Sequence, residues 1–149
     1  VAQVIRPALA AGRHVVSDRY VGSSLAYQGY GRGLPVEDIR RLSVWATGGL
    51  WPDVVVLLDL AVDVAAARMH ERPDRMEAAG GDFHRRVGDG YRALAAAEPD
   101  RWLVLDASPP PDELEAAVWR ALVERLPDLA ATPASPTGAT SAAATEERA

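Results

Sequence analysis

Residues 17–33, SDRYVGSSLAYQGYGRG, contain the side chains best suited to bind a charged ligand. Arg19 carries a guanidinium, which can donate paired hydrogen bonds to a phosphate or a carboxylate. Asp18, its neighbour, could orient this guanidinium or hold a metal-bound water. A structural arginine that pairs with Asp18 or with a helix end is the alternative. The residue types alone therefore leave two interpretations open, an anion-binding arginine and a structural one.

Four hydroxyl or amide side chains follow Arg19 in this stretch: Ser23, Ser24, Tyr27 and Gln28. Together they suit the sugar and the base edges of a nucleoside, because these present both hydrogen-bond donors and acceptors. Each tyrosine of the stretch, taken singly, is more typical of a core or surface aromatic residue. It is the cluster, and no single member of it, that favours a nucleoside site.

All 16 basic residues of the 149-residue sequence are arginine, and none is lysine. A phosphate-binding P-loop ends in Gly-Lys-Ser/Thr, and its lysine reaches the β- and γ-phosphates. The glycines at the end of the stretch, Gly29, Gly31 and Gly33, lack this lysine, and we predict that they are turn residues. No chemistry that needs a lysine can be carried by this sequence.

A second cationic group lies further along the chain, where Arg68, Arg72 and Arg75 fall within eight residues. On a continuous helix such a group usually forms a solvent-exposed face with salt bridges. Pro73 and the later Gly80-Gly81 pair interrupt a helix, so a mobile cationic lid is the other interpretation.

The elements that position these groups are predicted from apolar patterning. Near-continuous apolar runs predict buried strands at 14–18, 54–60 and 102–107. Helical patterns lie before and between them, at 2–11, 36–47, 63–68, 82–97 and 112–126. Alternating strands and helices predict an α/β fold, a parallel sheet with helices on both faces. Such sheets bind ligands beyond the carboxyl ends of their strands, which is where we expect Asp18 and Arg19.

Composition limits the class of protein. The sequence predicts one domain over residues 1–126, followed by an Ala/Thr/Ser/Pro-rich tail, 127–149, that has too few large apolar residues to fold. The net charge of −5 argues against a nucleic-acid partner. No apolar run reaches the roughly 20 residues needed to cross a bilayer, which argues against a membrane protein. The absence of cysteine fits a cytoplasmic location.

Four segments, in order along the chain, resemble bacterial thymidylate kinases: VIRPALAAGRHVVSDRYVGSSLAYQGYGRGLP, WPDVVVLLDL, DRMEAAGGDFHRRVGDGYRAL and WLVLDA. The resemblance runs from residue 1 to about residue 126 and leaves only the tail uncovered. It implies a P-loop kinase fold and transfer of the γ-phosphoryl group of ATP to thymidine monophosphate (dTMP), with Mg²⁺. It also implies a cytoplasmic enzyme of dTTP biosynthesis that is a homodimer when complete.

The resemblance also implies roles for individual residues. Arg19 would bind the monophosphate, and Asp18 would lie near the magnesium ion and the transferring phosphoryl group. The thymidine side of the site would be formed by Ser24, Tyr27 and Gln28, with Tyr27 close to the deoxyribose. Glu77, at an acidic position at the end of the lid, is assigned to the same substrate. The ATP side would be formed by Arg68, Arg72, Arg75 and, near the adenine, Ala107.

The sequence departs from the family pattern at its start. The family begins with a strand and a glycine-rich loop that ends in Gly-Lys-Ser/Thr, and neither is found here. We therefore expect this chain to be the carboxyl-terminal portion of a thymidylate kinase, with a sheet incomplete at the N-terminus and no activity by itself. The alternatives are another nucleoside or nucleotide kinase, or a non-catalytic nucleotide-binding remnant.

Overall fold

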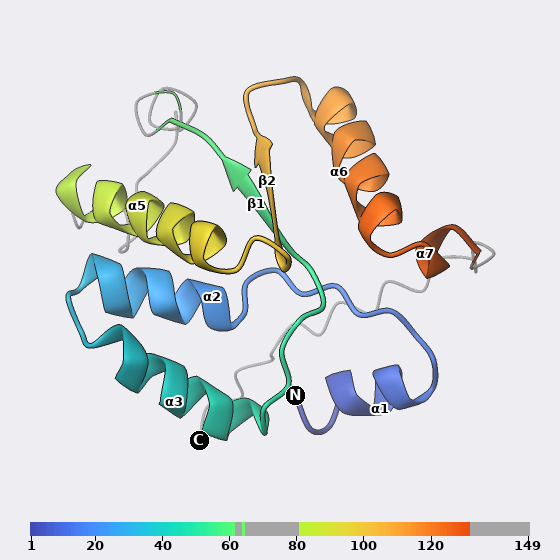
Figure 1. The fold of residues 1–149 in the computed structure, drawn as a ribbon, viewed down its shortest axis with the longest axis horizontal. Coiled ribbons are helices and arrows are strands. Elements are labelled where there is room, and N and C mark those ends of the chain that lie inside the picture. The colour runs from blue at the N-terminus through green and yellow to red at the C-terminus, as the bar shows by residue number, and fades with distance from the viewer. Residues whose placement is uncertain (62–63, 65–80, 132–149) are drawn as a thin grey trace, which may run out of the picture.

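The computed structural model describes residues 1–61, 64 and 81–131 (Figure 1). Three predictions therefore lie outside the described residues: most of the 63–68 helix, the lid residues Arg68, Arg72, Arg75 and Glu77, and the tail from residue 132 onward. Among the described residues, no helix is long and apolar enough to cross a membrane.

Two of the predicted strands form a parallel pair, which confirms the α/β class. β1 (Val55–Asp59) and β2 (Trp102–Asp106) run in register, with Asp59 beside Asp106. The backbone N–H of Ala107 donates to the carbonyl of Asp59 at 2.9 Å, which continues the ladder one residue past β2. Their runs of Val and Leu are typical of strands that helices cover from both sides.

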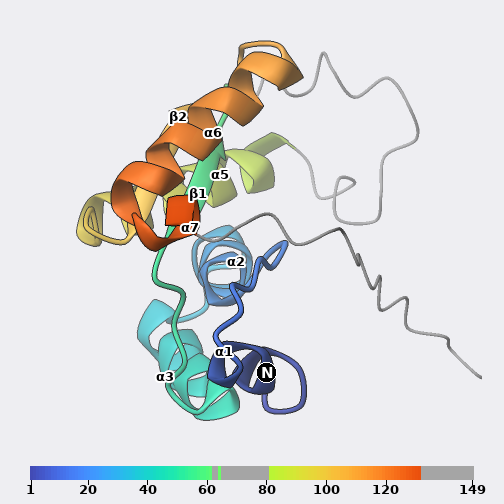
Figure 2. The same ribbon diagram turned by 90° about the vertical axis from the view of Figure 1, so that its right-hand side faces the viewer.

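Helices α5 (Gly81–Ala97) and α6 (Pro111–Arg125) lie on opposite sides of this strand pair (Figures 1 and 2). Both match predicted helices to within a residue or so, and α3 (Val36–Thr47) matches in full. α3 ends as predicted at Gly48, whose φ of 61° is the left-handed conformation that glycine adopts readily. The short α7 (Asp128–Ala131) lies in the first residues of the predicted tail.

α1 (Ile5–Ala10) is shorter than predicted and has no buried residue. It is tied to α3 by the guanidinium of Arg6, which donates to the carbonyls of Thr47 at 3.1 Å and Gly48 at 2.9 Å. These carbonyls belong to the last turn of α3, where no intrahelical donor remains. Arg6 therefore closes the carboxyl end of α3 and brings the start of the chain beside it.

The strand predicted at 14–18 is wrong, because residues 13–17 have no regular secondary structure. Val16 is 97% exposed, and the sheet of the described residues contains only β1 and β2. An apolar run is stable as a strand only where a neighbour completes its ladder, and no described element does so here. The hydroxyl of Tyr20 donates to the carbonyl of Leu50 at 3.2 Å, so it is Tyr20 that meets the chain entering β1. Asp18 and Arg19 therefore do not follow a strand.

A helix not predicted from sequence follows Arg19. It begins as α2 (Val21–Ser24), continues as the π-helix η1 (Leu25–Gly31), and lies between α3 and α5 (Figure 1). Gly29 and Gly31, predicted as turn residues, are buried within it, and only Gly33, with φ of 74°, is a turn glycine. A Cβ on Gly31 would lie 2.7 Å from the ring of Phe83 on α5, so this glycine allows close approach of two helices.

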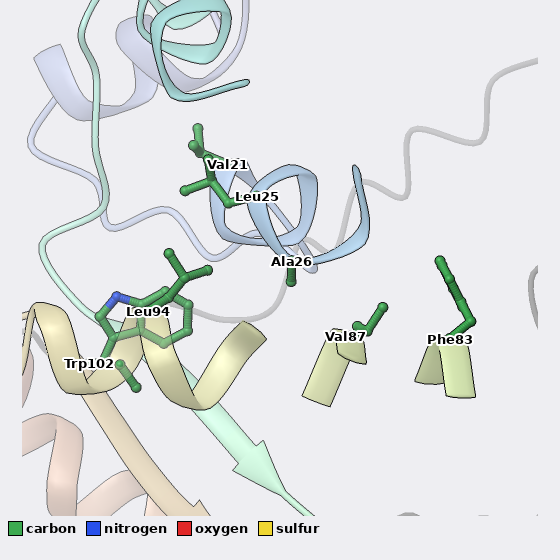
Figure 3. Packing of buried hydrophobic residues seen from close by; sticks show 8 residues of the cluster. Val21, Leu25, Ala26, Phe83, Val87, Leu94 and Trp102 are labelled. Carbon is green, nitrogen blue, oxygen red and sulfur yellow. The ribbon is translucent and has the colours of Figure 1, made fainter. Parts of the chain in front are cut away.

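The hydrophobic core lies where this helix meets α5 and the start of β2 (Figure 3). Its members are Val21, Leu25, Ala26, Phe83, Val87, Leu94, Ala95 and Trp102. No residue of α6 is buried. The core therefore holds the segment 20–31, which contains most of the predicted nucleotide-binding residues, against α5.

Candidate functional site

Arg19 is the one non-glycine residue with a positive φ, 63°, in the part of the chain that the structure describes. This left-handed conformation is unfavourable for a side chain with a Cβ, and such residues cluster at functional sites. The hydroxyl of Ser17 donates to the carbonyl of Arg19 at 2.9 Å, which helps to hold the turn. The backbone thus places the Arg19 side chain in a direction that an ordinary conformation would not reach.

The guanidinium of Arg19 lies over the ring of Tyr27, with 5.1 Å between its Cζ atom and the ring centroid. Hydrogen bonding to the Tyr27 side chain, followed by its electrostatic attraction, raises the pKa of Arg19 above its ordinary value. The group is therefore a permanent cation that rests on an aromatic surface. Because the residue is exposed, its donors remain accessible to an anion from solvent.

Tyr27 belongs to η1, a π-helix of seven residues. π-Helices are rare and are frequently found at functional sites. The Tyr27 ring meets the ring of Phe83 edge to face at 6.0 Å and that of Tyr91 at 6.3 Å. Both partners are on α5, so the predicted deoxyribose neighbour is fixed by a helix about 60 residues further along the sequence.

Tyr91 also contacts α2, since its hydroxyl and that of Ser23 are 2.8 Å apart. Burial raises the pKa of Tyr91, while the hydrogen bond with Ser23 and the charge of Arg19 lower it. The net shift is upward, so Tyr91 is a neutral hydroxyl at physiological pH. Ser23 belongs to the hydroxyl cluster that the sequence indicated. Tyr91 was not among the sequence-predicted site residues, although it belongs to the apolar stripe of the predicted helix 82–97.

An open groove of about 420 Å³ lies beside Arg19, between α2 and α3. It is lined by Arg19, Tyr20, Val21, Ser23, Ser24, Ser43, Ala46 and Thr47. Arg19 and Ser24, which sequence analysis assigns to one substrate, therefore face the same groove. Gln28 is exposed and does not line it.

Asp18 is exposed beside Arg19 and contributes to raising the Arg19 pKa. Among the described residues, no three His, Asp or Glu side chains are grouped so that they could hold a metal ion. Magnesium in nucleotide enzymes is commonly held by one or two carboxylates together with phosphate oxygens. Asp18 offers one carboxylate. A magnesium ion beside it would therefore need the phosphates of a bound nucleotide as its other ligands.

Ala107, predicted near the adenine, is buried directly after β2. Trp102, at the other end of β2, contacts the ring of Tyr91 at 6.3 Å. A strand rises about 3.3 Å per residue, so Ala107 lies about 16 Å along the strand from Trp102. Ala107 therefore lies at the carboxyl edge of the sheet and does not line the groove beside Arg19.

The carboxyl edge of β1 carries an ion pair with two hydrogen bonds. Arg92 of α5 binds Asp59 through two hydrogen bonds, of 2.9 Å from Nε and 2.8 Å from Nη2. Together with a contact to Asp89, this pairing raises the pKa of Arg92. The pair anchors α5 to the sheet one residue after Tyr91.

The family model for thymidylate kinase matches residues 1–118. The chain belongs to the thymidylate kinase family. A thymidylate kinase of Deinococcus radiodurans is 53% identical over 127 residues, which cover 84% of this chain and 62% of the relative. One from Synechococcus sp. is 52% identical, over 85% of this chain and 61% of the relative.

A third thymidylate kinase, from Desulforudis audaxviator, is 48% identical over 136 residues, which cover 89% of this chain and 62% of the relative. The chain thus spans about three fifths of the length of these curated relatives. Membership of the thymidylate kinase family confirms the resemblance drawn from the Asp18-Arg19-Tyr20 stretch. The roles of single residues remain predictions.

Proposed function

We propose that the protein containing this segment phosphorylates thymidine monophosphate to the diphosphate, with ATP and magnesium. Family membership supports the reaction, and one structural observation supports the acceptor site. Arg19 adopts a left-handed conformation that lays its guanidinium on the Tyr27 ring, at a groove it shares with Ser24. An exposed, permanent cation beside an aromatic ring and a hydroxyl suits a nucleoside monophosphate, which has an anionic end and a flat apolar base.

In the proposed reaction an oxygen of the monophosphate attacks the γ-phosphorus of ATP, the bond to the β-phosphate oxygen breaks, and ADP leaves. Arg19 holds and neutralises the attacking phosphate, so that two anionic groups can approach each other. Tyr27 contacts the deoxyribose, and Ser24 and Gln28 contact the nucleoside. Magnesium, held beside Asp18 together with the nucleotide, would offset the negative charge of the ATP phosphates.

The remaining assignments rest on the resemblance alone. Asp18 would act beside the metal-bound phosphates, Glu77 at the acceptor nucleotide, and Ala107 near the adenine. Arg68, Arg72 and Arg75 would contact ATP from the lid. The domain is proposed to span residues 1–126, with 127–149 as a tail that the fold does not need.

We also propose that the complete protein is a cytoplasmic homodimer. The outward side of α3 supports an interface, because Leu42 is 59% exposed and Trp45 is 81% exposed. Large apolar side chains exposed together mark surfaces that contact other proteins. Sedimentation equilibrium of the complete protein measures this directly, and a single monomeric species would contradict it.

Arg19 provides the test of the acceptor site. Because the sequence contains no lysine, we expect binding and no turnover from the 149-residue chain, and calorimetric titration is the suitable measurement. Arg19→Ala should weaken thymidine monophosphate binding by about 10- to 150-fold, since a hydrogen bond to a charged group contributes about 1.5–3 kcal/mol. Thymidine, which lacks the phosphate, is the matched control ligand, and its affinity should change by less than about threefold.

Three other results would change the proposal. An equal loss for thymidine and its monophosphate would make Arg19 a structural residue. Equal affinity for several nucleoside monophosphates would favour a kinase of another nucleotide. No binding of any nucleoside monophosphate by the unsubstituted chain would contradict the acceptor site itself.

A further inference from the structure

We propose that Tyr91 of α5 is a positioning residue of the acceptor-nucleotide site, which holds Ser23 and the Tyr27 ring in place and, through that ring, the guanidinium of Arg19. This inference rests on the proposed function for the identity of the ligand. It assigns Tyr91 no contact with the nucleotide and no part in the chemical step.

The Tyr91 side chain makes two contacts with residues of the site. Its hydroxyl lies 2.8 Å from the hydroxyl of Ser23, the neighbour of Ser24. Its ring meets the Tyr27 ring at 6.3 Å with an interplanar angle of 80°. A single rotamer of Tyr91 therefore fixes a point on α2 and a point on η1 at the same time.

The Tyr27 ring is held from two directions. Phe83 lies 6.0 Å from it and Tyr91 lies 6.3 Å from it, both edge to face. Phe83 and Tyr91 are eight residues apart on α5, about two helical turns, so they face the same way. The same ring carries the guanidinium of Arg19, whose Cζ lies 5.1 Å from the ring centroid. A shift of Tyr27 would therefore move the surface on which Arg19 rests.

Tyr91 itself is unable to move freely. A Cβ on the preceding residue, Gly90, would lie 2.6 Å from Cβ and Cγ of Tyr30, so the backbones of α5 and η1 are in close contact there. The following residue, Arg92, is fixed to Asp59 of β1 by two hydrogen bonds. One neighbour of Tyr91 is thus pressed against the nucleotide-binding helix and the other is anchored to the sheet.

If Tyr91 only filled space in the core, the expected effect of removing its hydroxyl would be different. Its ring also contacts Trp102 of the core at 6.3 Å, so the aromatic ring alone accounts for filling space between α2 and β2. Tyr91→Phe keeps that ring and removes the hydroxyl. A space-filling residue would tolerate this change, whereas a positioning residue would release Ser23 and loosen Tyr27.

The first measurement needs no nucleotide. In NMR spectra of the 149-residue chain, the Nε–Hε resonance of Arg19, assigned by its absence in Arg19→Gln, should carry an upfield ring-current shift from Tyr27. Tyr91→Phe and Ser23→Ala should each move it toward the position of a free arginine. The double variant should add nothing further, because both changes remove the same hydrogen bond.

Tyr30→Phe is the matched control. Tyr30 belongs to η1 and packs against the same turn of α5, and its hydroxyl has no hydrogen bond among the described residues. This variant loses the same atom from the same interface and should leave the Arg19 resonance unchanged. An unchanged Arg19 resonance in Tyr91→Phe, or an equal shift in Tyr30→Phe, would overturn the positioning role.

The second measurement connects the position of Arg19 to binding. Tyr91→Phe should weaken thymidine monophosphate binding by about two- to tenfold, the range expected for one neutral hydrogen bond. It should lower the melting temperature by about 2–6 °C, so that the chain stays folded at the temperature of the titration. Unchanged affinity would contradict the inference. If the unsubstituted chain binds no nucleotide while the Arg19 resonance still responds to Tyr91→Phe, the proposed function fails and the mechanical link from Tyr91 to Arg19 remains.

Discussion

The two sides of the strand pair are built differently. Where α2 and η1 meet α5, side chains are closely enclosed: Leu25 is 2% exposed and Leu94 is 3% exposed. On the side of α6 no helical residue is buried, and Trp119 remains 54% exposed. Val104 of β2, a strand residue, is 51% exposed. One half of the molecule is a compact core and the other half is loosely covered.

This difference matters for function because the candidate acceptor site lies entirely on the compact side. The Tyr27 ring, over which the exposed guanidinium of Arg19 lies, belongs to a helix that packs closely on α5 through glycines at which a Cβ would not fit. A binding group is useful only when its position is fixed to within a fraction of an ångström, and close packing supplies that restraint. The loosely covered side carries none of the residues assigned to the acceptor nucleotide.

The largest expected difference in stability is between alanine variants of two tryptophans. Trp102 is 7% exposed on the compact side, and Trp102→Ala should lower the free energy of unfolding by about 3–5 kcal/mol, because it removes a large buried side chain and leaves a cavity. Trp119→Ala, on α6, should change it by about 0.5 kcal/mol or less. Urea unfolding followed by circular dichroism measures both. Equal losses would show that α6 is as firmly held as α5.

A second comparison of stability uses alanine variants of two glycines of α5. Gly90→Ala should destabilise by about 1–2 kcal/mol, since the overpacking cost against Tyr30 outweighs the gain in helix propensity of about 1 kcal/mol. Gly88→Ala is the control two residues away, where the nearest described atom would be 3.8 Å from the new Cβ. It should stabilise by about 0.5–1 kcal/mol, because alanine favours the helix. A stabilising Gly90→Ala would mean that η1 and α5 can separate without loss.

The smallest expected effect concerns the ion pair of Arg92 and Asp59, whose side chains are 42% and 32% exposed. Arg92→Gln should destabilise by about 0.2–1 kcal/mol, because solvent screens an exposed pair. The difference from the unsubstituted chain should shrink in about 1 M salt, where the Debye length falls to about 3 Å. Unfolding at two salt concentrations tests this, and a loss that salt does not reduce would point to an uncharged role for Arg92.

Elements with a strong local pattern were predictable from the sequence. α3, α5 and α6 have helical apolar spacing, and β1 and β2 are short Val/Leu runs between turn residues, so neighbouring residues determine each of them. The segment 20–31 was not predictable as a helix, because its glycines and polar residues lower helix propensity. Contact with α5 outweighs that preference: Gly31 and Gly90 permit the approach, and Leu25 and Ala26 are buried by it.

The strand expected at 14–18 failed for a related reason. Its apolar residues were correctly identified, but a strand also needs a partner for its backbone, and partners are a property of the whole fold. Residue types identified Arg19, Ser24 and Tyr27 as nucleotide-binding candidates, and the family relationship supports that class of ligand. The residue types gave no indication that Tyr91 and Phe83 hold the Tyr27 ring. Aromatic residues on the buried stripe of a helix have the same sequence pattern whether or not they support a site.

The sequence by itself determined the kinds of groups available to this protein: an arginine-rich, lysine-free set of cations, a cluster of hydroxyls after Arg19, and alternating strands and helices. These follow from composition and from interactions within a few residues of each other. Only the tertiary structure decided the left-handed turn at Arg19, the π-helix that presents Tyr27, and the hydrogen bond between Ser23 and Tyr91, 68 positions apart. Each of these is locally unfavourable or locally undetermined, and each depends on contacts with other elements of the folded chain.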